Sequence, residues 1–238
     1  MLCKIADLIV DIPEVGDLVP RCQEYRFDEE EGGTGVDIII HTDLFRMNEW
    51  TVLSANDAVY LESGFVFRSG LLQYGGVVLH SSAVALDGKA YLFSAPCGTG
   101  KSTHTRLWKR TFGESAKVFN DDKPALRLID GVWYAYGTPW CGKDGININM
   151  KVPVAGICFL KQASENKIRR LTQAEAVQKI LRQTMHQFQR IERLDLMLNH
   201  VDRLVRMIPV YELENRPEAE AARLSYETMC CGAEEMGL

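Results

Sequence analysis

The sequence contains no apolar run that approaches the roughly 18 residues a bilayer-spanning helix needs. Its first residues also lack a basic segment followed by a long apolar stretch, which is the pattern of a secretory signal. We therefore expect a cytoplasmic protein with no membrane partner. Clusters of lysine and arginine are missing too, and 27 basic residues stand against 32 acidic ones for a formal charge of −5. Since nucleic-acid binding needs a basic surface, we expect no nucleic-acid partner.

Paired cysteines are also missing. The seven cysteines include no C-x-x-C pair and their number is odd, which favours reduced thiols over a disulfide framework or a zinc site. Hydrophobic residues make up 46% of the 238 residues, as in ordinary soluble domains. A chain of this size can form one sizeable domain with a small appendage. We expect an N-terminal β-rich portion over residues 1–75, with β-prone runs at 36–41, 58–61 and 65–67, and a larger core over residues 76–238.

The core begins with turn chemistry between apolar runs. Asp87-Gly88 predicts a tight hairpin, and Asp130-Gly131 predicts a second one. A helix is expected over residues 102–110, with Gly113 as its stop. Further strands are expected at residues 116–119, 125–129, 132–136 and 154–160.

The last third of the chain is expected to be mainly helical. Thr172 and Glu175 form a capping box, because each side chain can satisfy a free backbone N–H of the other residue. Apolar residues then recur at helical spacing, which predicts a helix or helix pair packed on the core. A strand at 208–213 and a capped helix after residues 215–218 complete the chain. The fold class is therefore α/β, with a mixed, twisted sheet.

One loop carries the clearest chemical pattern. Residues 95–102 read Ala-Pro-Cys-Gly-Thr-Gly-Lys-Ser and match G-x-x-x-x-G-K-[ST] except at Ala95, where the motif has glycine. A strand-like run precedes the loop and a helix-like run follows it. In such a loop the backbone N–H groups point at phosphate oxygens, and the helix N-terminus adds partial positive charge. The pattern predicts a P-loop that binds ATP or GTP.

The predicted loop assigns roles to individual side chains. Lys101 would contact the β- and γ-phosphates, and the Ser102 hydroxyl would contact Mg²⁺. A glycine turn that caps a helix is the structural alternative. The predicted nucleotide-binding residues are Pro96, Cys97, Gly98, Thr99, Gly100, Lys101, Ser102 and Thr103.

An acidic pair, Asp121-Asp122, follows Asn120 at the end of a β-prone run. Carboxylates at the C-terminal end of a strand lie where ligands bind in open α/β sheets. One carboxylate can orient Mg²⁺ while the other accepts a proton from an attacking hydroxyl. Asp122 is the candidate metal ligand, but the division of roles stays open. An acidic turn before Lys123 and Pro124 is the structural alternative.

In this order, the segments resemble the bacterial HPr kinase/phosphorylase family, whose nucleotide-binding core is shared with phosphoenolpyruvate carboxykinase. The similarity covers residues 76–162: the His80-containing run at 77–85, the loop at 91–103 and the acidic motif at 120–122. The resemblance implies that Lys101 and Ser102 serve phosphates and Mg²⁺, that the Asp pair supplies a base and a metal contact, and that His80 lies near the transferred phosphoryl group. It also implies a homo-oligomer.

The chain departs from that family after the acidic motif. The family's Glu-Ile-Arg-Gly run has no clear counterpart, and residues 137–143 read Gly-Thr-Pro-Trp-Cys-Gly-Lys instead. Trp140 and Lys143 are candidate acceptor-binding residues, and a purely structural aromatic turn is the alternative. The departure argues against HPr itself as the acceptor and against phosphorylase activity.

The leading hypothesis is an ATP- and Mg²⁺-dependent kinase that transfers the γ-phosphoryl group to a hydroxyl. The acceptor would be a protein or peptide serine, or a small molecule. Some relatives in the resembled family modify precursor peptides, which makes a peptide acceptor an analogy. A nucleotide-binding regulatory module with little chemistry is the alternative, and a carboxykinase-like enzyme that acts on a small acid is a third. The Asp pair favours an enzyme, whereas the missing family Glu favours the regulatory module.

Overall fold

The computed structural model describes residues 1–27, 35–41, 54–184 and 191–238. Its strands are β1 (Leu2–Ile5), β2 (Leu8–Asp11), β3 (Ile38–Ile39), β4 (Gly76–Val78), β5 (Ser81–Leu86), β6 (Lys89–Ser94), β7 (Lys117–Asn120), β8 (Ala125–Ile129), β9 (Val132–Tyr136), β10 (Lys151–Gln162), β11 (Lys167–Arg170) and β12 (Val210–Asn215). Its α-helices are α1 (Leu18–Arg21), α2 (Ala55–Leu71), α3 (Lys101–Phe112), α4 (Gln173–Thr184), α5 (Ile191–Met207) and α6 (Ala219–Glu235). Short 3-10 turns cover Gln23–Tyr25, Leu72–Tyr74 and Gly113–Ser115.

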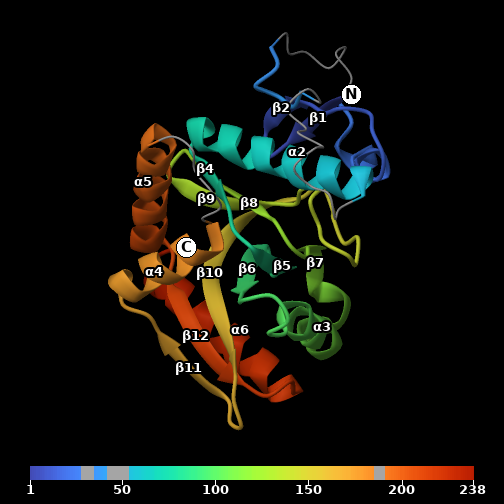
Figure 1. Cartoon of the computed structure of the whole chain (residues 1–238). Helices are drawn as coiled ribbons and strands as arrows, with labels where there is room; N and C mark the ends of the chain where they lie inside the picture. Colours follow the sequence, from blue (N-terminus) through green and yellow to red (C-terminus); the bar gives the residue numbers. More distant parts are fainter. Residues whose placement is uncertain (28–34, 42–53, 185–190) are drawn as a thin grey trace.

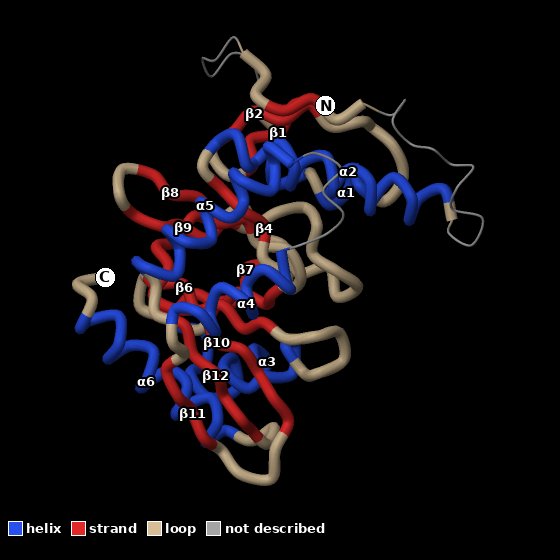
Figure 2. Tube along the Cα trace, turned by 60° about the vertical axis from the view of Figure 1, so that its left-hand side comes forward, coloured by secondary structure: helices blue, strands red, loops and turns tan. Residues whose placement is uncertain are grey.

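A large mixed sheet forms the body of the molecule (Figure 1). Its strand order is β4-β8-β9-β10-β6-β5-β7, with β12 added on β10 and β11 on β12. The long strand β10 runs parallel to β6 and β12, while the other neighbouring strands are antiparallel. Its first residues pair with β9 and its later residues with β6 and β12, so one strand joins the two ends of the sheet. Figure 2 shows how strongly the sheet twists between these ends.

Strand β6 shows how the sequence builds the two faces of this sheet. Successive side chains of a strand point to opposite faces. Tyr91 and Phe93 pack with α3 and α6, whereas Ala90 and Leu92 belong to the cluster that α4 and α5 cover. All four are fully buried, so this strand must be apolar on both faces. Burying one such large side chain contributes about 1.5–3 kcal/mol.

The two predicted Asp-Gly turns and the capping box at Thr172 are confirmed. Asp87 and Gly88 both have positive φ (51° and 73°), which is the conformation of the hairpin turn between β5 and β6. Asp130 and Gly131 do the same between β8 and β9, at 49° and 82°. The backbone N–H of Thr172 donates to Glu175 Oε2 at 2.9 Å, and the N–H of Glu175 donates to Thr172 Oγ1 at 3.4 Å. The capping box therefore begins α4.

The N-terminal portion differs from the prediction. Residues 58–61 and 65–67 were expected as strands, but they lie within α2, a helix of 17 residues. Ser54 caps this helix by accepting the N–H of Asp57 at 3.1 Å. The expectation was wrong because short apolar runs fit a strand and a helix equally well, and only longer periodicity separates the two. A small sheet of β1, β2 and β3 lies beside α2 (Figure 1).

Charged contacts hold the small sheet against the large one. Asp7 accepts hydrogen bonds from Tyr136 and from Lys151, each at 2.7 Å. Arg127 donates to the backbone oxygen of Ala6 at 2.5 Å. The N-terminal segment therefore lies on the β8–β9 end of the large sheet, where it also helps to position α2.

Three further expectations concern the cysteines, the cap of the last helix and membrane-spanning helices. All seven cysteines are free thiols, as expected. The cap expected at residues 215–218 is wrong, because the N-cap residue Glu218 makes no side-chain capping bond. Of the helices in the described ranges, none offers enough length and hydropathy to cross a membrane.

His104 on α3 predicts a measurable pH dependence of stability. The sequence suggests a half-exposed helix residue, but the side chain is buried beside Ser225, with Nε2 at 3.1 Å from the serine Oγ. Burial lowers its pKa from 6.5 to about 3. Below pH 6.5 the unfolded chain takes up a proton that the folded chain refuses, so stability falls by up to about 1.4 kcal/mol per pH unit until pH nears the folded pKa.

Urea unfolding of the wild type and of His104→Gln between pH 7 and pH 4 measures this effect. We expect the free energy of unfolding to fall less steeply with decreasing pH in the variant, whatever its absolute stability. His41→Gln, at an exposed position, should keep the wild-type slope. Equal slopes for His104→Gln and wild type would contradict the prediction.

Candidate functional site

The loop after β6 joins a central strand to the start of α3. Gly98 and Gly100 have φ values of 79° and 113°, a region that side chains with a Cβ rarely enter. A Cβ at Gly98 would meet no atom within 4 Å, so backbone conformation, not crowding, requires glycine there. Lys101 is the first residue of α3, and its Nζ donates to the backbone oxygen of Ala95 at 3.0 Å. The ammonium group therefore lies over the loop.

The other predicted loop residues line the same turn. Pro96, Cys97, Gly98 and Thr103 are exposed, while Thr99, Gly100 and Ser102 are partly buried. The N–H of Thr99 donates to the backbone oxygen of Pro96 at 3.2 Å, which closes the turn. Ser102 Oγ makes no hydrogen bond within the part of the chain that the structure describes. A hydroxyl at the start of a helix is thus left available to a ligand.

Asn120 holds the acidic loop in shape. Its Oδ1 accepts the backbone N–H groups of Asp122 and Lys123 at 3.2 and 2.8 Å. Its Nδ2 donates to the backbone oxygen of Thr138 at 2.9 Å, and Thr138 Oγ1 donates to the backbone oxygen of Lys123 at 2.8 Å. These bonds join the end of β7 to the segment after β9. Asn120 and Thr138 therefore hold the backbone that carries the two carboxylates, a role that the sequence did not reveal.

Asp122 lies between the side chains of His80 and Lys123. Its Oδ1 is 3.3 Å from His80 Nε2 and its Oδ2 is 2.5 Å from Lys123 Nζ. Burial of Asp122 opposes its ionisation, but the hydrogen bonds to His80 and Lys123 outweigh burial and lower its pKa to about 2. Asp122 is consequently a fixed anion at neutral pH and a weak base.

Asp121 differs from Asp122 in its contacts. Its side chain is only 9% exposed, and its Oδ1 is buried without a hydrogen-bond partner in the described residues. Leaving a buried polar atom unpaired costs about 1–3 kcal/mol, so such atoms in folded proteins call for a specific explanation. The free oxygen can accept a proton or contact a ligand.

His80 connects the acidic loop to the loop of Lys101. Its backbone oxygen accepts from Ser94 Oγ at 2.8 Å, at the residue that ends β6. Its Nδ1 lies 3.0 Å from Gln183 Oε1 near the end of α4. Burial lowers the pKa of Lys101, and the charges of Asp122 and Asp121 partly offset this effect. The structure thus brings His80, Lys101 and the Asp pair into electrostatic reach of one another.

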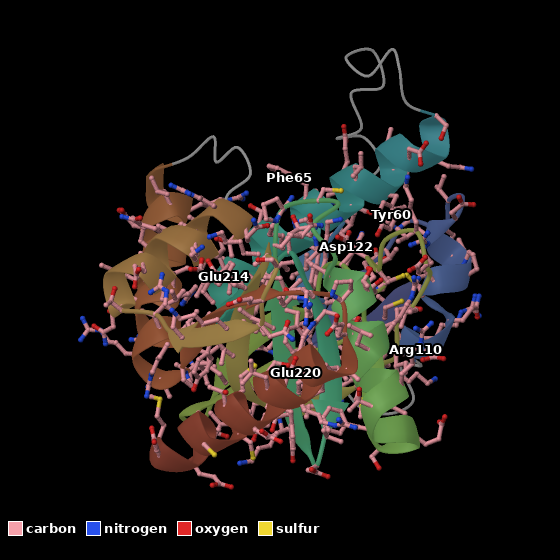
Figure 3. All side chains as sticks on the ribbon, turned by 90° about the horizontal axis from the view of Figure 1, so that it is seen from below. Tyr60, Phe65, Arg110, Asp122, Glu214 and Glu220 are labelled. Atoms are coloured by element: carbon pink, nitrogen blue, oxygen red, sulfur yellow. The ribbon has the colours of Figure 1, made fainter. Side chains whose placement is uncertain are left out.

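Helix α2 adds residues that the sequence prediction missed. Tyr60 Oη accepts the N–H of Gly142 at 3.1 Å, and the guanidinium of Arg21 lies 4.8 Å from the centre of the Tyr60 ring. Lys123 Nζ lies 5.6 Å from the same ring. Figure 3 shows Tyr60 close to Asp122. The S-x-x-D pattern at Ser54 could have identified the helix, because it is a known cap signature.

The two candidate acceptor-binding residues lie in different surroundings. The Trp140 side chain is 2% exposed, stacks on Phe67 with ring centres 4.6 Å apart, and donates to Ser63 Oγ at 3.1 Å. Such packing suits the structural alternative. Lys143 is exposed. The acceptor-binding role of both residues stays a prediction.

Fold and site define a mixed α/β protein in which a strand–loop–helix segment faces an acidic pair. The chain belongs to the family described as SynChlorMet cassette protein ScmC, whose sequence pattern matches residues 48–217. That match contains every site residue from Tyr60 to Gln183. Comparison with the curated proteins gave no match.

Solved structures give a weak similarity. The HPr(Ser) kinase/phosphatase from Coxiella burnetii aligns over 66% of this chain and 90% of its own, with 11% sequence identity and a TM-score of 0.37. This level of similarity is too low to assign a reaction to the chain.

Proposed function

We propose that this protein binds a nucleoside triphosphate with Mg²⁺ at the loop before α3 and transfers the γ-phosphoryl group to a hydroxyl acceptor. One observation carries the proposal. A lysine at the end of a glycine-shaped loop shares an electrostatic site with two carboxylates from another part of the chain, and one of them, Asp121, has a buried oxygen without a partner among the described residues.

The loop residues supply the nucleotide contacts in this proposal. Gly98 and Gly100 allow backbone N–H groups to approach phosphate oxygens, and the N-terminus of α3 adds partial positive charge. Lys101 contributes the ammonium that contacts the β- and γ-phosphates. Phosphoryl transfer depends mainly on such positioning and charge neutralisation.

The residues present are compatible with Mg²⁺. No three His, Cys, Asp or Glu side chains within the described ranges cluster as a metal site, so an ion would rely on phosphate oxygens and water, as Mg²⁺ commonly does. Ser102 has a free hydroxyl, and Asp122 stays ionised with lone pairs left over from its two hydrogen bonds. Both are hard oxygen donors. When bound, Mg²⁺ neutralises charge on the phosphates.

The two carboxylates take different roles in the proposal. Asp122, with its pKa near 2, is too weak a base to remove a hydroxyl proton effectively and suits the metal side of the site. Asp121 offers the free oxygen to the acceptor hydroxyl. His80, held by Asp122 and Gln183, would stabilise negative charge on the transferred group.

Calorimetric titration with ATP and Mg²⁺ tests the proposal. Lys101→Ala is expected to weaken binding at least tenfold, about 1.4 kcal/mol, because the ammonium contact with the phosphates is lost. Lys109→Ala is the matched control, since Lys109 is an exposed residue near the other end of the same helix. A folded wild type that binds neither ATP nor GTP would refute the proposal.

A further inference from the structure

One face of α2 carries three residues at helical spacing, and two of them contact the segment that covers the acidic loop. Tyr60, Gly64 and Arg68 are four residues apart and so share a face. Tyr60 accepts the N–H of Gly142, and a Cβ at Gly64 would lie 2.8 Å from a carbon of the Trp140 ring. A Cβ added to Gly142 would in turn lie 3.2 Å from Cβ of Asp122. The face thus packs on the segment that covers the acidic loop, and Arg68 is its third member.

Arg68 differs from the other arginines that the fold covers. Four arginines in the described ranges are not exposed: Arg21, Arg68, Arg127 and Arg193. Three of them form hydrogen bonds within the fold. Arg21 donates to Gly142, Arg127 donates to Ala6 and Tyr74, and Arg193 donates to Ser69. Arg68 makes no hydrogen bond or ion pair with any described residue, and its guanidinium only lies over the Phe65 ring, 5.0 Å from the centre.

The charge of Asp122 acts on Arg68 but does not satisfy it. Burial lowers the pKa of Arg68 to about 10, and Asp122 offsets part of that effect. The two oxygens of Asp122 contact His80 and Lys123, and neither forms a hydrogen bond with Arg68. A guanidinium offers five N–H donors in a planar fork, which fits a carboxylate or phosphate group in a bidentate manner. A partly desolvated cation without a hydrogen-bond partner among the described residues is therefore stabilised when such an oxyanion binds.

We propose that Arg68 binds an oxyanion group, carboxylate or phosphate, of the phosphoryl acceptor, so that the acceptor is an anionic molecule. This inference rests on the proposed kinase function. The nucleotide contacts come from the loop between β6 and α3, whereas Arg68 comes from α2, and Asp122 is the charge that both Lys101 and Arg68 experience. A group held by Arg68 lies beside the acidic pair, where the acceptor hydroxyl loses its proton. The cation also reduces repulsion between an anionic acceptor and the nucleotide phosphates.

The test uses the full chain saturated with Mg²⁺ and a non-hydrolysable ATP analogue, so that the loop cannot take up added anions. Inorganic phosphate and acetate are then titrated in separate calorimetric experiments, which distinguish the two oxyanions. We expect one of them to bind the wild type and to bind Arg68→Gln at least tenfold more weakly. Arg68→Lys should fall between the two, because it keeps the charge and loses the fork.

Two controls separate this inference from the proposed function. Arg110→Gln removes an exposed arginine of α3 that lies far from Phe65 in Figure 3, and it should leave anion binding unchanged. The affinity of Arg68→Gln for the ATP analogue should stay within about twofold of wild type, because Arg68 is placed outside the nucleotide contacts. If Arg68→Gln does not fold, Arg68→Lys supplies the comparison.

The outcomes differ for the two claims. Normal nucleotide binding with no anion binding, or with anion binding that is equal in Arg68→Gln, would overturn the role of Arg68 and leave the kinase proposal standing. Arg68-dependent anion binding in a protein that binds no nucleotide would overturn the kinase proposal and, with it, the assignment of the anion as an acceptor.

Discussion

Alanine at position 137 is expected to destabilise the protein by about 3 kcal/mol or more, or to prevent folding. A Cβ on Gly137 would lie 1.8 Å from the backbone oxygen of Ile148 and 2.9 Å from its carbonyl carbon. Neither segment can yield, because the Gly137 N–H donates to the backbone oxygen of Met150 at 3.0 Å and the Ile148 N–H donates to that of Phe119 at 2.9 Å. Urea unfolding, followed by tryptophan fluorescence and circular dichroism, measures the loss.

Gly35→Ala provides the matched control. That glycine has ordinary φ and no atom within 4 Å of an added Cβ, so the substitution should change stability by less than about 0.5 kcal/mol. A Gly137→Ala variant as stable as the control would show that the segments around Gly137 and Ile148 adapt easily. In that case the tight positioning of Thr138 and Asn120, which follows directly from this packing, would also be in doubt.

Local chemistry made much of the core predictable. The two Asp-Gly turns were identified because positive φ at both turn residues suits few other pairs. The strand–loop–helix segment followed from glycines at Gly98 and Gly100 and from the stop at Gly113, all of which have positive φ. In each case the residue type is required by backbone conformation within a few positions, so no knowledge of distant contacts was needed.

Long-range packing explains what the sequence did not reveal. Helix α2 was missed because it carries apolar residues at exposed positions, Leu61 and Phe65, as well as on its buried face, where Phe67 and Leu71 belong to the N-terminal cluster. No single stripe of apolar residues then marks it as amphipathic. Missing the helix also hid Arg68. The burial of Trp140 depends in the same way on Phe67, which is distant in the sequence.

The sequence also could not show how the two carboxylates of the acidic pair differ in their contacts. Asp121 and Asp122 are adjacent and chemically identical, so their roles stayed open. The fold separates them, because His80 and Lys123 both reach Asp122 while Asp121 Oδ1 is left without a partner in the described residues. Both partners of Asp122 come from positions that β-strand geometry and the Asn120 turn bring together.

Asp121→Asn is expected to lower phosphoryl transfer by about 10²–10⁴-fold, the usual contribution of a general base. Because the acceptor is undefined, ADP formation from ATP and Mg²⁺ is measured with water as the acceptor. Nucleotide affinity should stay close to wild type, since an amide replaces the carboxylate with little change of shape. Asp130→Asn is the control, because Asp130 is exposed, and asparagine tolerates its φ of 49°.

Asp122→Asn should behave differently, which makes the pair informative. Removing its charge leaves His80 and Lys123 without their anionic partner, so we expect weaker Mg²⁺-dependent binding and lower stability together with lost turnover. If both variants form ADP at the wild-type rate, the pair has no catalytic role. If the wild type binds nucleotide firmly but forms no ADP, even with an anionic hydroxyl compound bound at Arg68, the chain acts through occupancy of its loop, and the regulatory-module hypothesis replaces the kinase.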